Sequence, residues 1–125
     1  VEDIVDLLEL EPIRRKLVGL LPFGQRKRVE LGRALALEPK ILLLDELMTG
    51  MNVEEKEDMA RFALDISELK KIPMVLVEHD MEVVTELASG IYVLHQGQVL
   101  CTGNVDDIKC DPQVQEVYLG RAVDA

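Results

Sequence analysis

Two short aliphatic runs constrain the fold of this chain more than any other feature of its sequence. Residues 41–44 read Ile-Leu-Leu-Leu and residues 74–77 read Met-Val-Leu-Val, and each run ends in ionisable side chains. Continuous apolar runs of this length are typical of strands that are buried on both faces of a parallel sheet. Residues 53–70, between the two runs, carry apolar side chains at helical spacing. A strand, a helix and a strand in this order form a βαβ unit with a right-handed crossover, so the sequence predicts an α/β fold.

The predicted helix over residues 53–70 is well specified at both ends. Asn52 is expected to cap it, and Glu55, three residues later, completes an Asx version of a capping box. Acidic side chains crowd the first turn and two lysines follow the last one, which suits the helix dipole. One apolar stripe marks the side that faces the core, and it consists of Met59, Phe62, Ala63, Ile66 and Leu69.

Three further helices are expected before the end of the chain. Apolar spacing places them over residues 3–10, 25–37 and 81–88. Pro12 ends the first and Glu38-Pro39 stops the second, because proline cannot continue a helix.

The last third of the chain predicts a hairpin and two small helices. Residues 91–94 and 98–101 flank a Gln96-Gly97 turn, which is typical of a β-hairpin. One small helix is capped by Asn104 and the other begins at Pro112. The expected architecture is therefore a parallel βαβ core with a C-terminal hairpin and small helices.

The charge balance argues against a protein that binds nucleic acid. The 125 residues include 14 Lys and Arg against 24 Asp and Glu, a formal net charge of −10, which opposes association with a phosphate polyanion. No apolar stretch approaches the roughly 18–20 residues that span a bilayer, and Val1-Glu2-Asp3 is acidic where a signal peptide is basic. We therefore expect a cytoplasmic protein without direct membrane insertion. The start at Val1 rather than Met favours a piece of a longer protein, and Cys101 and Cys110 are interpreted as reduced thiols.

Ionisable residues follow both aliphatic runs, at the strand ends where α/β sheets bind ligands. Asp45 and Glu46 come after the first run, and His79 comes after the second. Consecutive side chains of an extended segment leave on opposite sides, so Asp45 and Glu46 need separate roles. Asp45 suits Mg²⁺, which takes one or two carboxylates with phosphate oxygens and waters. Glu46 suits the orientation or deprotonation of an attacking water.

His79 could contact a phosphate or orient water, because a histidine is readily tuned near neutral pH. A plainer interpretation is that the acids after the strands only meet solvent and that His79 is a solvated loop residue. Asp80 is expected to cap the helix over 81–88, and His95 is expected at the surface.

Three cations follow Gly24 and Gln25 in the first turns of a predicted helix. Arg26, Lys27 and Arg28 oppose the positive end of the helix dipole. A phosphate bound at the Gly24 helix N-terminus would turn this cost into a gain. The alternative is that the long side chains point into solvent and pair with acids.

Several of these segments resemble, in order and in spacing, the motifs of ATP-binding cassette (ABC) ATPases. The segments are Leu21-Pro22-Phe23-Gly24-Gln25, Arg33-Ala34-Leu35-Ala36, Ile41-Leu42-Leu43-Leu44-Asp45-Glu46, Gly50-Met51-Asn52 and Val77-Glu78-His79-Asp80. They look like the signature loop and its helix, the Walker B strand, the D-loop and the switch histidine, and the resemblance runs over essentially the whole chain. Gly50-Met51-Asn52 and the ending Asp111-Pro112-Gln113-Val114 with Tyr118-Leu119-Gly120 are similar to the branched-chain amino acid importer subgroup.

The resemblance implies a role for each matching residue. Asp45 would hold Mg²⁺ through water, Glu46 would be the catalytic base, and His79 would contact the γ-phosphate of ATP. Gly24 and Gln25 would face ATP bound to a second ABC ATPase subunit in a head-to-tail dimer, and Asn52 of the D-loop would join that nucleotide site. The implied function is ATP binding and hydrolysis that drives import of branched-chain or related amino acids through transmembrane permease subunits, on the inner face of the cell membrane.

The same resemblance implies the organisation of residues 1–125 as the C-terminal part of a P-loop NTPase-type domain. Residues 1–38 correspond to the end of the helical subdomain, and residues 39–125 to the Walker B, D-loop and switch-histidine part of the catalytic core. No G-x-x-x-x-G-K-[ST] phosphate loop is present, so we expect this piece alone to be inactive. Pro22 stands where the family signature has a serine, and Leu47-Met48 follow Glu46 where the family has proline.

Two other functions are compatible with these motifs. One is a non-catalytic interaction module that kept the fold, which Pro22 favours. The other is a non-transport ABC ATPase of DNA maintenance, which the net charge of −10 and the absence of heptads before the signature disfavour. The coding sequence upstream of Val1 separates the three functions. A phosphate loop there supports the transporter ATPase, and a long coiled coil supports the DNA enzyme. The absence of both supports the interaction module.

Overall fold

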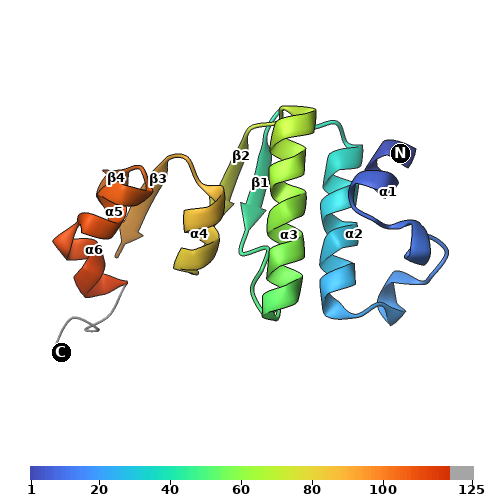
Figure 1. The fold of residues 1–125 in the computed structure, drawn as a ribbon, viewed down its shortest axis with the longest axis horizontal. Coiled ribbons are helices and arrows are strands. Elements are labelled where there is room, and N and C mark those ends of the chain that lie inside the picture. Colours follow the sequence, from blue (N-terminus) through green and yellow to red (C-terminus); the bar gives the residue numbers. More distant parts are fainter. Residues whose placement is uncertain (119–125) are drawn as a thin grey trace. The chain divides into compact units, whose positions relative to one another are not determined.

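The computed structural model describes residues 1–118, which fall into two compact units. The first unit covers Val1–Val83 and the second begins at Val84. Figure 1 shows their elements along the chain. Leu119-Gly120, which belong to the importer-like ending, lie outside the described residues.

The first unit contains a two-stranded parallel sheet and the helices before and between its strands. In chain order the elements are α1 (Glu2–Leu7), the 3₁₀ turns η1 (Glu11–Ile13) and η2 (Val18–Leu20), α2 (Phe23–Ala36), β1 (Leu42–Asp45), α3 (Val53–Asp65), the π-helical turn η3 (Ile66–Lys70) and β2 (Met74–Val77). β1 pairs with β2 in parallel, with Leu42 opposite Met74 and Asp45 opposite Val77. The predicted α/β class and the parallel βαβ core are confirmed.

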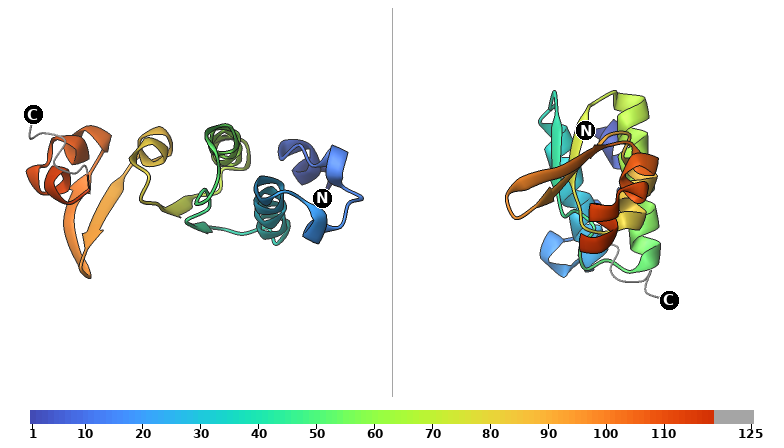
Figure 2. Two further views of the ribbon diagram at one scale, coloured as in Figure 1. Left: turned by 90° about the horizontal axis from the view of Figure 1, so that it is seen from below. Right: turned by 90° about the vertical axis from the view of Figure 1, so that its left-hand side faces the viewer.

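One face of this sheet is covered and the other is open. Figure 2 shows α3 on one face of β1 and β2, with α2 beside α3. Leu42 and Leu44 are buried, whereas Leu43 between them is 70% exposed. Val75 and Val77 are also exposed. The expectation that both strands are buried on both faces is therefore wrong within the first unit, because no element of that unit covers the second face. An aliphatic run alone does not show what covers it.

The long helix begins as predicted and ends differently. The Asn52 side chain accepts from the Glu55 backbone N–H at 2.8 Å, and the Glu55 carboxylate accepts from the Asn52 N–H at 3.1 Å. From Ile66 the backbone takes a π-helical turn, which has more residues per turn than an α-helix. Ile66 remains fully buried, but Leu69 is rotated out of the apolar stripe and is 70% exposed. The assignment of Leu69 to the stripe is wrong for this reason.

The second unit is a hairpin with two short helices. α4 (Met81–Leu87) leads into it, and β3 (Ile91–His95) and β4 (Gln98–Gly103) pair antiparallel with an irregularity between Val93 and Leu94. Gln96 and Gly97 both have positive φ angles, 49° and 78°, as a tight hairpin turn requires. The predicted hairpin is confirmed.

The helices α5 (Val105–Cys110) and α6 (Pro112–Val117) begin at their predicted caps. Asn104 forms a capping box with Asp107, and Asp111 accepts from the N–H groups of Gln113 and Val114. Ile108 and Val114 are buried and supply the core of this unit.

Two properties of the described residues bear on the environment of the chain. Among residues 1–118, every helix is too short or too polar to cross a bilayer. Cys101 and Cys110 are free thiols, as predicted, and burial raises the pKa of Cys101, with Asp111 adding to the effect.

Candidate functional site

The carboxyl ends of β1 and β2 bring two predicted catalytic residues together. The Glu46 N–H donates to the Val77 carbonyl at 2.8 Å, which continues the parallel ladder one residue beyond β1. His79 follows two residues after Val77, and its Nδ1 lies 3.6 Å from the Glu46 Oε1. The two side chains are 66% and 53% exposed, so an incoming ligand can reach both. Asp45 is exposed at the end of β1.

The backbone at Glu46 departs from the extended conformation that the sequence suggested. Its φ angle is +50°, in the left-handed region that non-glycine residues rarely adopt. The argument that Asp45 and Glu46 must point to opposite sides is therefore wrong, because it assumed an extended segment through both residues. The left-handed residue ends β1 and turns the chain into the next loop.

The loop after Glu46 is anchored by apolar side chains. Leu47, Met48 and Met51 are all buried. The Thr49 N–H donates to the Glu46 carbonyl at 3.2 Å and the Met51 N–H to the Met48 carbonyl at 3.2 Å. Leu47-Met48, which the sequence comparison marked as a departure from the family pattern, are therefore core residues that hold this loop.

The two carboxylates next to His79 in the chain form hydrogen bonds to neighbouring segments. Glu78 Oε1 accepts from the Met48 N–H at 3.3 Å, and Asp80 Oδ2 accepts from the Lys56 ammonium at 2.7 Å. Asp80 Oδ1 also accepts from the Glu82 N–H at 3.0 Å, which confirms its role at the start of α4. The Lys56 hydrogen bond lowers the pKa of Asp80, and the same bond raises the pKa of Lys56.

Sequence reasoning did not single out Lys56 or Glu78. Lys56 lies one turn into α3, and its partner is 24 residues away in the chain. The one available signal for Lys56 was its place in the chain: the first turns of α3 come after the end of β1, as the residues around His79 come after the end of β2. A cavity of about 80 Å³ lies among these residues, and its lining includes Lys56, Glu78, His79 and Asp80.

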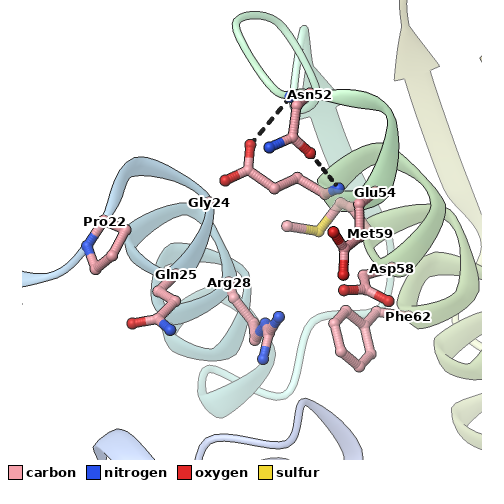
Figure 3. A pocket seen from close by; sticks show the side chains of 10 residues that line it. Pro22, Gly24, Gln25, Arg28, Asn52, Glu54, Asp58, Met59 and Phe62 are labelled. Carbon is pink, nitrogen blue, oxygen red and sulfur yellow. Dashed lines mark hydrogen bonds between the residues drawn. The ribbon is translucent and has the colours of Figure 1, made fainter.

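The predicted nucleotide contacts Gly24, Gln25 and Asn52 meet at a second, larger cavity. Its volume is about 230 Å³, and it lies between the start of α2 and the first turns of α3 (Figure 3). Gly24 is buried against the capping box: a Cβ there would lie 2.8 Å from the Glu55 Oε1. The signature-like loop therefore lies against the capping box that begins α3 in the first unit.

The cations after Gln25 are partly engaged by the protein. Lys27 pairs with Glu30 at 3.2 Å and its ammonium lies 5.7 Å from the Phe23 ring. Arg28 points from α2 toward Phe62 in Figure 3, with its guanidinium 4.9 Å from the ring centroid. Lys27 thus pairs with an acid, as the alternative interpretation expects, whereas Arg28 packs on an aromatic ring instead. The phosphate hypothesis stays a prediction.

The carboxylates fit a magnesium ion that is held mostly by other ligands. Residues 1–118 contain no group of three or more His, Cys, Asp or Glu side chains placed to hold a metal. Mg²⁺ typically keeps several waters and takes one or two carboxylates together with substrate phosphates. One exposed carboxylate, Asp45, is compatible with that chemistry.

Comparison with known proteins shows a similarity to ABC transporter ATPases. A family model described as ABC transporter matches residues 1–49, and one described as branched-chain amino acid ATP-binding cassette transporter matches residues 98–124. The high-affinity branched-chain amino acid transport ATP-binding protein BraF of Pseudomonas aeruginosa is 32% identical over 115 residues, which are 92% of this chain and 45% of BraF. The chain is thus similar to the ATP-binding proteins of ABC transporters along most of its length.

Other ABC proteins resemble the chain to a similar degree. The sulfate/thiosulfate import ATP-binding protein CysA of Mesorhizobium japonicum is 35% identical over 93% of this chain and 34% of its own length. An ATP-binding cassette of an ABC transporter, solved in its ADP conformation, superposes with a TM-score of 0.85 at 30% identity, over 94% of this chain and 48% of that one. The chain thus spans about a third to a half of the length of these ABC relatives.

Proposed function

We propose that this chain is part of the nucleotide-binding subunit of an ABC importer, in which ATP binding and hydrolysis drive uptake of branched-chain or related amino acids. The observation that carries the proposal is the approach of Glu46 and His79, 3.6 Å apart at the carboxyl ends of two parallel strands. The match of residues 98–124 to the branched-chain model and the likeness to BraF favour this substrate class over sulfate.

The proposed roles follow from the position of each side chain. Glu46 would accept a proton from the attacking water or orient it, because its carboxylate is exposed at a strand end. His79 would contact the γ-phosphate from the neighbouring strand end. Asp45 would hold Mg²⁺ through water, and the ion would supply charge stabilisation for the phosphate oxygens when bound.

Gly24, Gln25 and Asn52 would contact ATP bound to a second ABC ATPase subunit. The common cavity that they line supports this grouping. We propose a head-to-tail dimer of such subunits attached to transmembrane permease subunits on the cytoplasmic face of the membrane. In the same scheme, residues 1–38 end the helical subdomain and residues 39–125 belong to the catalytic core.

Pro22 gives specific support to a second candidate, a non-catalytic module. It precedes α2 and forms no side-chain capping hydrogen bond there. A serine at this position would offer a hydroxyl to the helix start or to a phosphate. If the signature loop has lost that contact, the fold persists without turnover.

The Glu46→Gln variant of the complete protein separates the two candidates. If Glu46 activates water, turnover falls by about 10²–10⁴-fold while ATP affinity stays nearly unchanged, since Gln keeps the shape and loses the base. The measurements are steady-state ATP hydrolysis with Mg²⁺ and equilibrium ATP binding. Glu57→Gln, at an exposed carboxylate on α3, is the matched control.

His79→Ala provides an independent test in the same assay. Slower hydrolysis with retained ATP binding supports its contact with the γ-phosphate, and unchanged turnover returns His79 to the role of a solvated loop residue. A parent protein that binds ATP but never hydrolyses it supports the non-catalytic module.

A further inference from the structure

His79 lies on a loop whose two neighbouring residues are both tied to other elements. Glu78 accepts from the Met48 N–H, in the turn after β1, at 3.3 Å. Asp80 accepts from the Lys56 ammonium of α3 at 2.7 Å. The His79 side chain itself is 66% exposed and approaches Glu46 at 3.6 Å. The position of His79 therefore depends on the bonds of its neighbours more than on its own contacts.

Asp80 is fixed in two directions at once. Its Oδ2 accepts from Lys56 and its Oδ1 from the Glu82 N–H at the start of α4. The Lys56 and Asp80 side chains are only 34% and 26% exposed, so solvent competes less with this pair than with a surface ion pair. The carboxylate thus joins α3 to the first turn after the His79 loop.

Lys56 also connects the loop to the D-loop-like turn. Its backbone N–H donates to the Asn52 carbonyl at 3.0 Å, within the first turn of α3. Asn52 lines the cavity with Gly24 and Gln25, and Lys56 lines the smaller cavity with His79. One helical turn therefore separates the residue proposed to face a partner's nucleotide from the ion pair beside His79.

We propose that Lys56 is a positioning residue whose ion pair with Asp80 holds residues 78–80 in place and so keeps His79 beside Glu46. The expected effect of Lys56 on hydrolysis rests on the proposed function. The expected effect of Lys56 on the loop does not rest on that function. Lys56 acts through Asp80 and the loop backbone, and it touches neither nucleotide nor water in the reaction.

The test uses the complete protein and the variants Lys56→Met, Asp80→Asn and the double variant. A small displacement of a catalytic group costs up to about 10²-fold in rate, so we expect Lys56→Met to lower kcat about 10- to 100-fold. The KM for ATP is expected to stay within about twofold, because the ion pair does not bind nucleotide. The double variant is expected to be no slower than the slower single variant, since both remove one interaction.

Hydrogen exchange gives a readout that does not need turnover. Loss of the ion pair is expected to speed exchange at the amides of residues 79–82 and to leave those of β1 unchanged. Lys56→Arg keeps a cation and is expected to restore most of the rate and of the protection. Glu9→Gln is the matched control. It removes a 3.0 Å ion pair between Glu9 and Arg61, and Arg61 lies on α3 like Lys56 but away from His79.

The outcomes separate the two proposals. Parent-like exchange and parent-like kcat in Lys56→Met overturn the positioning role. Additive losses in the double variant overturn the pairing, even if each single variant is slow. A parent protein without ATP hydrolysis overturns the proposed function, and hydrogen exchange still decides whether Lys56 holds the loop.

Discussion

The left-handed backbone at Glu46 sets this residue apart from the other strained positions of the described chain. Non-glycine residues with positive φ are Glu9, Glu38, Glu46, Lys71 and Gln96. Glu38 follows α2, Lys71 follows η3 and Gln96 forms the hairpin turn, where such angles are common. Glu46 instead follows β1 and lies beside His79, and strained backbone of this kind clusters at functional sites.

This strain leads to a prediction for Glu46→Gly. Glycine adopts positive φ without the clash that a Cβ meets, so the substitution is expected to leave the free energy of unfolding unchanged or to raise it by up to about 1 kcal/mol. Turnover is expected to fall as far as in Glu46→Gln. Urea unfolding and ATP hydrolysis of the complete protein measure the two effects.

Glu38→Gly is the control for that prediction, because Glu38 has a similar φ of 52° after α2 and no proposed catalytic role. It is expected to give the same stability change with normal turnover. A marked loss of stability in Glu46→Gly alone contradicts the interpretation, since it means that the Glu46 side chain supports the fold.

At the scale of elements, the features that the sequence predicted are the local ones. Asn52 and Asn104 cap their helices through residues only three positions away, and the Gln96-Gly97 turn forms within its own hairpin. Such signals depend on a few neighbouring residues, so they can be recognised directly in the sequence. The parallel pairing of β1 and β2 is the exception, because it joins distant segments, yet the two aliphatic runs and the intervening helix predict it.

The features that the sequence did not predict depend on distant residues or on small backbone changes. The bond between Lys56 and Asp80 spans 24 residues, and nothing in either segment specifies the other. The exposure of Leu43 depends on which layer covers the sheet. The outward turn of Leu69 depends on one π-helical turn, which the apolar periodicity of α3 does not show.

The π-helical turn predicts unequal stability losses for two residues that the sequence placed in one apolar stripe. Ile66 is fully buried, so Ile66→Ala is expected to lower the free energy of unfolding by about 2–5 kcal/mol. Leu69 is 70% exposed, so Leu69→Ala is expected to change it by less than about 0.5 kcal/mol. Denaturant unfolding of both variants checks this. Equal losses at the two positions would show that the helix stays α-helical to its end and buries Leu69.

At the scale of the whole molecule, the open face of the β1–β2 sheet is the main liability of these 125 residues. Leu43 and Val75 are cross-strand neighbours in the register, and both are exposed, as are Ile41 and Val77. Within the described part of the chain, β1 and β2 pair only with each other, so each also has a free edge. Apolar faces and free strand edges of this kind promote association.

We therefore predict that the isolated 125-residue chain self-associates or is partly molten. Sedimentation velocity is expected to show a molecular mass that rises with concentration, and hydrogen exchange is expected to show weak protection in β1 and β2. A monodisperse monomer with strongly protected amides in both strands contradicts the prediction and shows that these residues form a self-sufficient domain.

A charged pair on the open face tests the cause of that association. Leu43→Lys combined with Val75→Glu places opposite charges on directly paired residues, so the strands keep a favourable cross-strand contact while the face becomes polar. This double variant is expected to shift sedimentation toward the monomer. Leu69→Lys, at a leucine that is equally exposed but lies off the sheet, is the control and is expected to associate like the parent. If Leu69→Lys reduces association as much as the double variant does, the loss of any exposed apolar side chain, rather than the sheet face in particular, controls it.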